Sequence, residues 1–81
     1  MFSIGDIVSY GPKRNANTGE IIKTSKHPDG MPFYTVREYA RFWPISELPH
    51  NEEHLRLATK REAQFFQEEK KEWFLNFGAT K

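Results

Sequence analysis

The fold is decided by the stretch that begins Gly5-Asp6-Ile7-Val8-Ser9-Tyr10 and continues as a ladder of short strand-like runs. The later runs read Thr18-Gly19-Glu20-Ile21-Ile22-Lys23-Thr24, Phe33-Tyr34-Thr35-Val36-Arg37-Glu38, Arg41-Phe42-Trp43-Pro44 and His54-Leu55-Arg56-Leu57. Turn-forming residues separate the runs, and this spacing is typical of a very small all-β domain. Because side chains alternate along a strand, Val8 and Tyr10 are expected on one face, and Tyr34 and Val36 are expected to face the core.

The connections between the runs carry their own signals. His27-Pro28-Asp29-Gly30 is suited to a tight turn, since proline presets the first central position and glycine tolerates positive φ. Pro44 cannot donate to a sheet ladder, so the strand that carries Trp43 is expected to end there. The segment Ile45-Ser46-Glu47-Leu48-Pro49 is predicted to form one short helical turn, closed by proline.

A capping box marks the start of a helix after the last run. In Thr59-Lys60-Arg61-Glu62 the threonine side chain can bond the backbone of the third helical residue, and the glutamate can reach back. The helix is predicted over residues 60–77, with Gly78 ending it in the left-handed conformation. One face at helical spacing holds Ala63, Phe66, Lys70, Trp73, Phe74 and Phe77, while Phe65 and Leu75 fall off that face.

The helix is long for so small a sheet. Its length is roughly 27 Å, whereas a five-residue strand spans only about 17 Å. The helix is therefore expected either to overhang the sheet with its aromatic end or to cross it diagonally.

The ladder resembles the small SH3-like barrels of the Tudor and KOW kind. The resemblance rests on Gly5-Asp6-Ile7-Val8, Thr18-Gly19-Glu20-Ile21-Ile22, Phe33-Tyr34-Thr35-Val36 and Trp43-Pro44-Ile45-Ser46-Glu47-Leu48. A short helical turn before the last strand is also usual in such barrels. The resemblance covers roughly residues 4–57 and implies a five-stranded barrel that binds peptides, methylated side chains, nucleic acid or other domains. The whole chain, 1–81, is predicted to be a single domain: a mainly β, SH3-like barrel over about 4–57, followed by one amphipathic helix over about 60–77.

The composition of the chain limits the classes of function that it can have. The chain has 81 residues, a formal net charge of +1 and no cysteine. The small net charge argues against a protein that works mainly by neutralising phosphates. The lack of cysteine favours an intracellular, cytoplasmic location. No apolar run is long enough for a membrane span, and the first residues do not resemble a signal peptide.

Catalytic and metal-binding patterns are weak. The sequence has no cysteine nucleophile, no glycine-rich phosphate cradle and no nucleophile elbow, so a non-enzymatic protein is expected, without a cofactor. His50 and His54 are four residues apart with Glu53 between them, which on a helix would suit zinc. Pro49 argues against a helix there, and no third ligand is in sight, so no metal site is predicted.

The aromatic face of the helix is the strongest functional signal. Its residues could simply cover the barrel, or they could form an exposed patch of the kind that marks a protein interface. The predicted function is a small accessory subunit or inhibitor that docks on another protein, or on a copy of itself, through the helix and the adjoining barrel surface. The predicted anchors are Trp73, Phe74, Phe77, Phe65, Phe42 and Trp43.

A basic group supports a second hypothesis. Lys13, Arg14, Lys23 and Lys26 lie on the first two connections and the strand between them, and nearby aromatic rings could stack on bases. A nucleic-acid-binding barrel is the alternative to the protein-binding module, and an ordinary solvated hairpin is the simplest explanation of these charges. A reader of methylated side chains would need an aromatic cage around Trp43.

Overall fold

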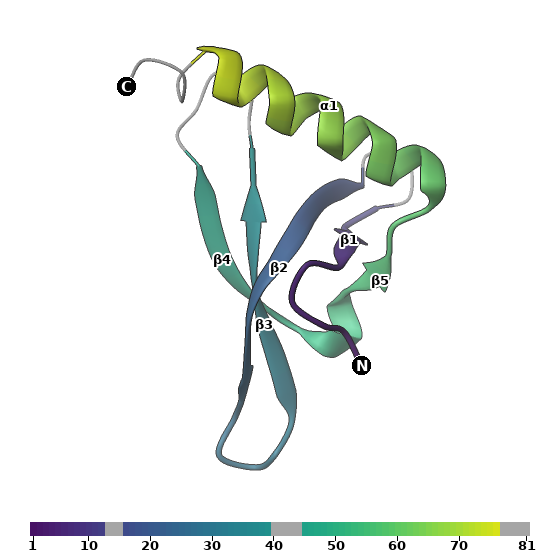
Figure 1. The fold of residues 1–81 in the computed structure, drawn as a ribbon. Coiled ribbons are helices and arrows are strands. Elements are labelled where there is room, and N and C mark those ends of the chain that lie inside the picture. Colours follow the sequence, from purple (N-terminus) through teal and green to yellow (C-terminus); the bar gives the residue numbers. More distant parts are fainter. Residues whose placement is uncertain (13–15, 40–44, 77–81) are drawn as a thin grey trace.

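The computed structural model describes residues 1–12, 16–39 and 45–76. Within them a five-stranded sheet is followed by one helix (Figure 1). The elements in chain order are β1 (Ile7–Tyr10), β2 (Asn17–Lys26), β3 (Pro32–Glu38), β4 (Ser46–Asn51), the 3-10 helix η2 (Glu52–His54), β5 (Arg56–Leu57) and α1 (Lys60–Asn76). The prediction of a mainly β chain with five strands and a C-terminal helix is confirmed.

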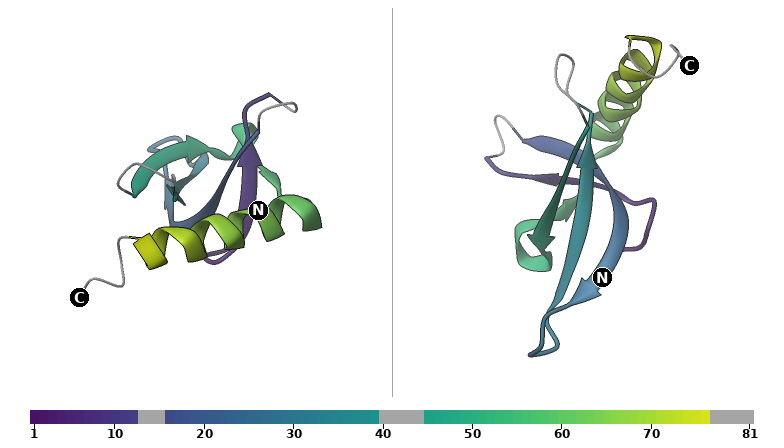
Figure 2. Two further views of the ribbon diagram at one scale, coloured as in Figure 1. Left: turned by 90° about the horizontal axis from the view of Figure 1, so that it is seen from above. Right: turned by 90° about the vertical axis from the view of Figure 1, so that its left-hand side faces the viewer.

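The sheet is antiparallel throughout, in the order β4-β3-β2-β1-β5. Its two edge strands, β4 and β5, are not paired with each other, so the sheet curls without closing into the expected barrel. The short last strand is one physical reason, since β5 has only two residues and both pair with β1. Figure 2 shows the curl from two further directions.

One local prediction was wrong. The segment 45–49 was expected to form a helical turn, but Ser46–Asn51 is strand β4 and pairs with β3 along its whole length. Pro49 is tolerated because an edge strand can leave the missing donor on the side that faces solvent. The helical turn before the last strand lies instead at η2. The predicted strand at 41–44 and the predicted helix end at Gly78 lie outside the described residues.

The turn between β2 and β3 forms as predicted. The Gly30 amide donates to the carbonyl of His27 at 2.8 Å, and Gly30 has a φ of 90°. A side chain would be strained at that φ, so the glycine is required by the backbone.

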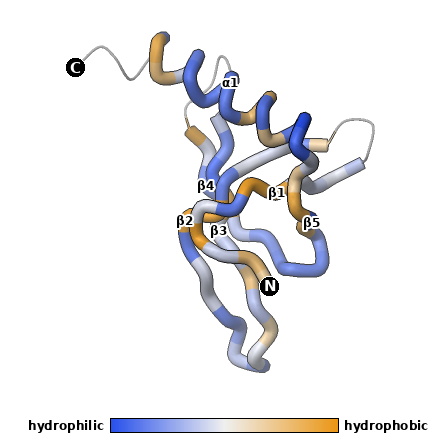
Figure 3. The backbone as a smooth tube through the Cα atoms, turned by 45° about the vertical axis from the view of Figure 1, so that its right-hand side comes forward, coloured by the Kyte–Doolittle hydropathy of each residue, from blue (hydrophilic) through white to orange (hydrophobic). Residues whose placement is uncertain are grey.

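The inner face of the curled sheet carries the main core. Val8, Tyr10, Tyr34 and Val36 are buried there, as their alternation predicted. Leu55 completes the buried cluster from the segment between η2 and β5, and Phe2 packs against it from the N-terminal segment. In Figure 3 the hydrophobic stretches of the strands meet in this region.

The helix α1 packs on the opposite, outer face at one end of the sheet (Figures 1 and 2). Opposed residues of paired strands share a face, so Ser9 of β1 and Glu20 of β2 both lie on the outer side. Ser9 is fully buried beneath the helix, and Phe66 of α1 is 1% exposed. The helix runs obliquely across one end of the sheet, from β1 and β5 towards the ends of β3 and β4 (Figures 1 and 2), so the diagonal arrangement is the one observed.

Glu62 joins the helix to the sheet. Its carboxylate accepts hydrogen bonds from the Ser9 hydroxyl at 2.9 Å, the Thr59 amide at 2.9 Å and the Arg56 guanidinium at 3.0 and 3.2 Å. The Glu62 amide donates to Thr59 Oγ1 at 3.1 Å, which completes the predicted capping box. Arg56 and these hydrogen bonds lower the pKa of Glu62 from 4.5 to about 2.

The neighbouring residues Phe65 and Phe66 test whether the helix is part of the folded unit. Phe66→Ala should lower the free energy of unfolding by about 3 kcal/mol or more, because it leaves a cavity between helix and sheet. Phe65 is 57% exposed, so Phe65→Ala should cost less than about 1 kcal/mol. Urea unfolding of both variants measures the difference, and equal losses would contradict the packing described.

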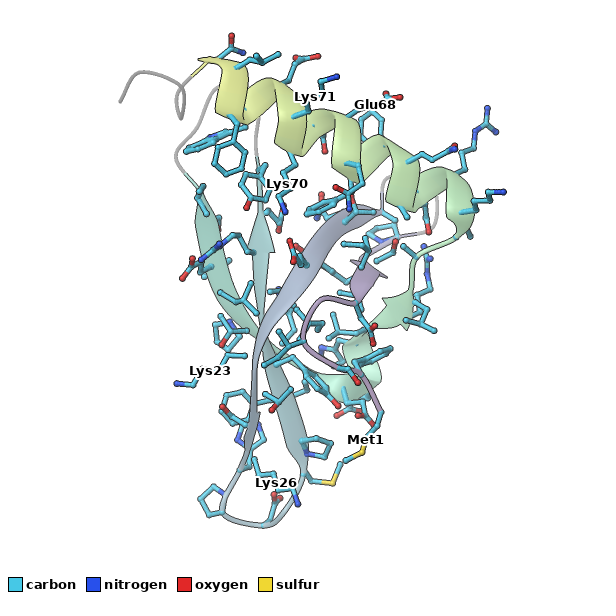
Figure 4. All side chains as sticks on the ribbon, in the orientation of Figure 1. Met1, Lys23, Lys26, Glu68, Lys70 and Lys71 are labelled. Atoms are coloured by element: carbon cyan, nitrogen blue, oxygen red, sulfur yellow. The ribbon has the colours of Figure 1, made fainter. Side chains whose placement is uncertain are left out.

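Glu62 predicts an acid-sensitive helix. A carboxyl whose pKa is lowered on folding stabilises the fold above its unfolded pKa, and that contribution is lost as pH falls towards the folded value. The free energy of unfolding should therefore decline between about pH 5 and pH 2, and Glu62→Gln should flatten this decline. Thermal unfolding across that range is the measurement. Glu68→Gln, on the exposed side of α1 (Figure 4), is the control and should keep the wild-type profile.

Candidate protein-binding surface

Tyr39 lies at the centre of an aromatic cluster between the end of β3 and the helix. Its ring contacts Phe66 at 5.8 Å, Trp73 at 5.7 Å and Phe74 at 5.6 Å between centroids. Trp73 and Phe74 also contact each other edge to face at 5.2 Å. Each such pair adds roughly 0.5–1.5 kcal/mol beyond the area that it buries. The cluster therefore fixes the C-terminal part of α1 against β3.

Lys70 supports the cluster from the same side of the helix. Its amine lies 3.2 Å from Glu20 Oε1 on β2 and 5.7 Å from the centroid of the Tyr39 ring. Figure 4 shows Lys70 pointing towards the sheet, whereas Lys71 and Glu68 point away from it. A lysine in the middle of the predicted apolar face is thus accommodated by an ion pair and an aromatic ring.

The solvent exposure of the rings in this cluster increases along the helix. Phe66 is buried, Trp73 is half-buried and Phe74 is 44% exposed. Phe66 is therefore a core residue, one of the two roles that the sequence left open for this face. The Phe74 ring contacts two other rings and still reaches solvent. We call Trp73 and Phe74 the aromatic surface; Tyr39, which is only 4% exposed, is the buried ring on which both rest.

Two further apolar residues are exposed elsewhere on the helix. Phe65 and Leu75, 57% and 65% exposed, fall off the packed face as predicted. Phe65 and Phe74 are nine residues apart, which at about 100° per residue places them on opposite flanks of the helix. The predicted anchors Trp73 and Phe74 are thus brought together, whereas Phe65 lies on the other flank of the helix, where it lines a pocket with Tyr39.

Three predicted anchors, Phe42, Trp43 and Phe77, lie outside the described residues. Tyr39 was missing from the predicted set. The alternation of β3 contains a signal for it, because Tyr39 follows Arg37 by two positions and Arg37 lies on the outer face.

The described part of the basic group does not form one face. Lys23 pairs with Thr35, and Lys26 pairs with Pro32 three positions further along β2, so the two lysines point to opposite sides of the sheet. Figure 4 shows them apart. Lys13 and Arg14 lie outside the described residues. Nucleic-acid binding stays a prediction that this geometry does not strengthen.

The histidine pair considered for metal binding is divided between two elements. His50 lies in β4 and His54 in η2, rather than on one helix. The described residues contain no group of three or more potential metal ligands. His50 packs instead on the ring of Tyr10, at 4.3 Å between centroids.

Comparisons with family models, with curated proteins and with solved structures gave no match. The class that the structure defines is a small antiparallel β-domain with a C-terminal helix. Among the described residues, no helix has both the length and the apolar character needed to cross a membrane.

Tyr39 is predicted to hold Trp73 in place. Tyr39→Ala should lower the free energy of unfolding by about 3 kcal/mol and expose the indole, because three ring contacts are lost. In a Trp43→Phe background, Trp73 is the only remaining tryptophan, and its emission should shift to longer wavelength. An unchanged emission maximum in a folded variant would show that the cluster does not shield Trp73.

Proposed function

We propose that this protein is a non-enzymatic, protein-binding module whose docking site is the aromatic surface of Trp73 and Phe74, supported from beneath by the buried Tyr39. It would act as a small accessory subunit or inhibitor, bound to another protein or to a copy of itself. The observation that carries this proposal is the Phe74 ring, which two neighbouring rings contact while nearly half of it stays open to solvent.

A ring held in this way suits an interface anchor. Large, rigid aromatic side chains contribute much of the binding energy of interfaces, and Trp and Tyr are enriched among the residues that matter most. Because Tyr39 and Trp73 already restrict Phe74, less side-chain entropy is lost when a partner covers it. Such preorganisation favours a specific contact over nonspecific hydrophobic association.

Sequence neighbours extend the same argument. Phe42 and Trp43 follow Tyr39 within four residues, and Phe77 follows the last residue of α1. These three residues are anchors predicted from the sequence, and they lie outside the described residues. Their supply of apolar area favours a protein partner over a highly charged one.

The finer assignment to the SH3-like barrels is part of this proposal. The glycine-led start of the ladder and the 3-10 helix immediately before β5 support it. The helix α1 is the feature that this resemblance does not explain, and it supplies most of the docking site. A cytoplasmic location is supported by the cysteine-free composition.

The test compares two equal substitutions on opposite flanks of one helix. Phe74→Glu should abolish binding because it places a charge at the centre of the docking site, whereas Phe65→Glu should leave binding intact. Self-association is measured by sedimentation over a concentration series. Binding to other proteins is measured by quantitative capture with wild type and both variants.

Circular dichroism melts first establish that both variants are folded. A partner retained by wild type and Phe65→Glu but lost by Phe74→Glu supports the proposal. Equal retention by all three proteins, together with unchanged sedimentation, contradicts it.

A further inference from the structure

Two strands that do not pair, β1 and β4, are in contact through a pair of rings on the inner face. The strand order places β2 and β3 between β1 and β4. Nevertheless the Tyr10 ring of β1 lies against the His50 ring of β4, with centroids 4.3 Å apart and planes 40° from parallel. The Tyr10 hydroxyl donates to the Glu38 carboxylate on β3. Tyr10 of β1 thus contacts β3 through its hydroxyl and the edge strand β4 through its ring.

The burial of His50 has a free-energy cost. Its Nε2 atom is buried and has no hydrogen-bond partner among the described residues. In the neutral ring Nε2 can carry a lone pair, and an unpaired acceptor costs little free energy. In the protonated ring Nε2 carries a charged N–H, which would be buried without an acceptor. The closed arrangement therefore favours the neutral imidazole.

The charged groups around His50 have opposite effects on its pKa. From β3, the Glu38 carboxylate attracts a proton to the ring, while from η2 His54 repels a second positive charge. The Tyr34 hydroxyl, opposite His50 in the register, donates to Glu52. Burial is the largest influence, so the pKa of His50 is lowered in the folded chain.

We propose that the Tyr10–His50 contact is a pH-sensitive latch: protonation of His50 releases the end of β4 from β1 and opens the inner face of the sheet. Release is local, because β4 is an edge strand whose only strand partner among the described residues is β3. Leu48, on the inner face opposite Val36, is already 52% exposed, so opening would enlarge an apolar edge.

The direction of the response follows from linkage. A histidine held neutral in the closed state and free to titrate in the open state favours opening as pH falls below its ordinary value of about 6.5. Each pH unit below that value raises the opening constant by at most about tenfold, until the closed-state ring itself titrates. Between pH 7.5 and 5.5 the opening constant should therefore rise by up to about tenfold.

Amide exchange followed by NMR measures this opening strand by strand. Protection factors, which remove the intrinsic pH dependence of exchange, should fall for residues 46–51 between pH 7.5 and 5.5. Those of β1, β2 and α1 should change much less. His50→Phe keeps a ring against Tyr10 without a titrating group, and should remove the loss in β4.

The other two histidines provide the controls. His27→Gln and His54→Gln should each still lose β4 protection as pH falls, because both retain His50. The size of the loss should change in each, since His27 Nε2 lies 2.8 Å from Asn51 Oδ1 of β4 and the charge of His54 acts on His50. In wild type, the His50 ring resonance should titrate below the ordinary histidine pKa of about 6.5, a readout that needs no variant. The latch is overturned if the His50 ring titrates at or above that ordinary value, or if β4 loses protection equally in wild type and a folded His50→Phe.

Discussion

The carboxylate of Glu62 is the contact on which the arrangement of helix and sheet depends. It bonds the backbone that starts α1, the side chain of Ser9 in β1 and the guanidinium of Arg56 in β5. A capping box ordinarily fixes only where a helix begins. Here the same glutamate also fixes the direction in which the helix leaves the sheet, since both sheet partners lie on the outer face.

That direction produces the candidate docking site. The helix crosses the outer face obliquely, so its first half packs over β1 and β2 through the buried Phe66 while its last turns reach Tyr39 at the end of β3. The sheet consequently has two apolar clusters, one on each face. The inner cluster stabilises the domain, and the outer one passes gradually from core at Phe66 to surface at Phe74.

Alternation and capping were readable from the sequence because both depend on neighbours in the chain. Tyr34 and Val36 face the core, and Thr59 to Glu62 starts the helix, as predicted. Strand β4 was missed because its cause is nonlocal: two prolines suggested a turn, and only pairing with β3 makes the segment extended. The separation of Phe65 from Phe74 follows from helix geometry, but the contacts of Tyr39 required the fold.

The proline within β4 also affects whether two copies of this chain can pair edge to edge. An exposed edge strand offers a row of backbone donors and acceptors on which a second molecule can extend the sheet. Pro49 removes one donor from the middle of that row, and Glu47 adds a charge two residues earlier. Edge-to-edge stacking, from which cross-β fibrils grow, is therefore interrupted at this strand. The open sheet can leave β4 uncovered without becoming a template for aggregation.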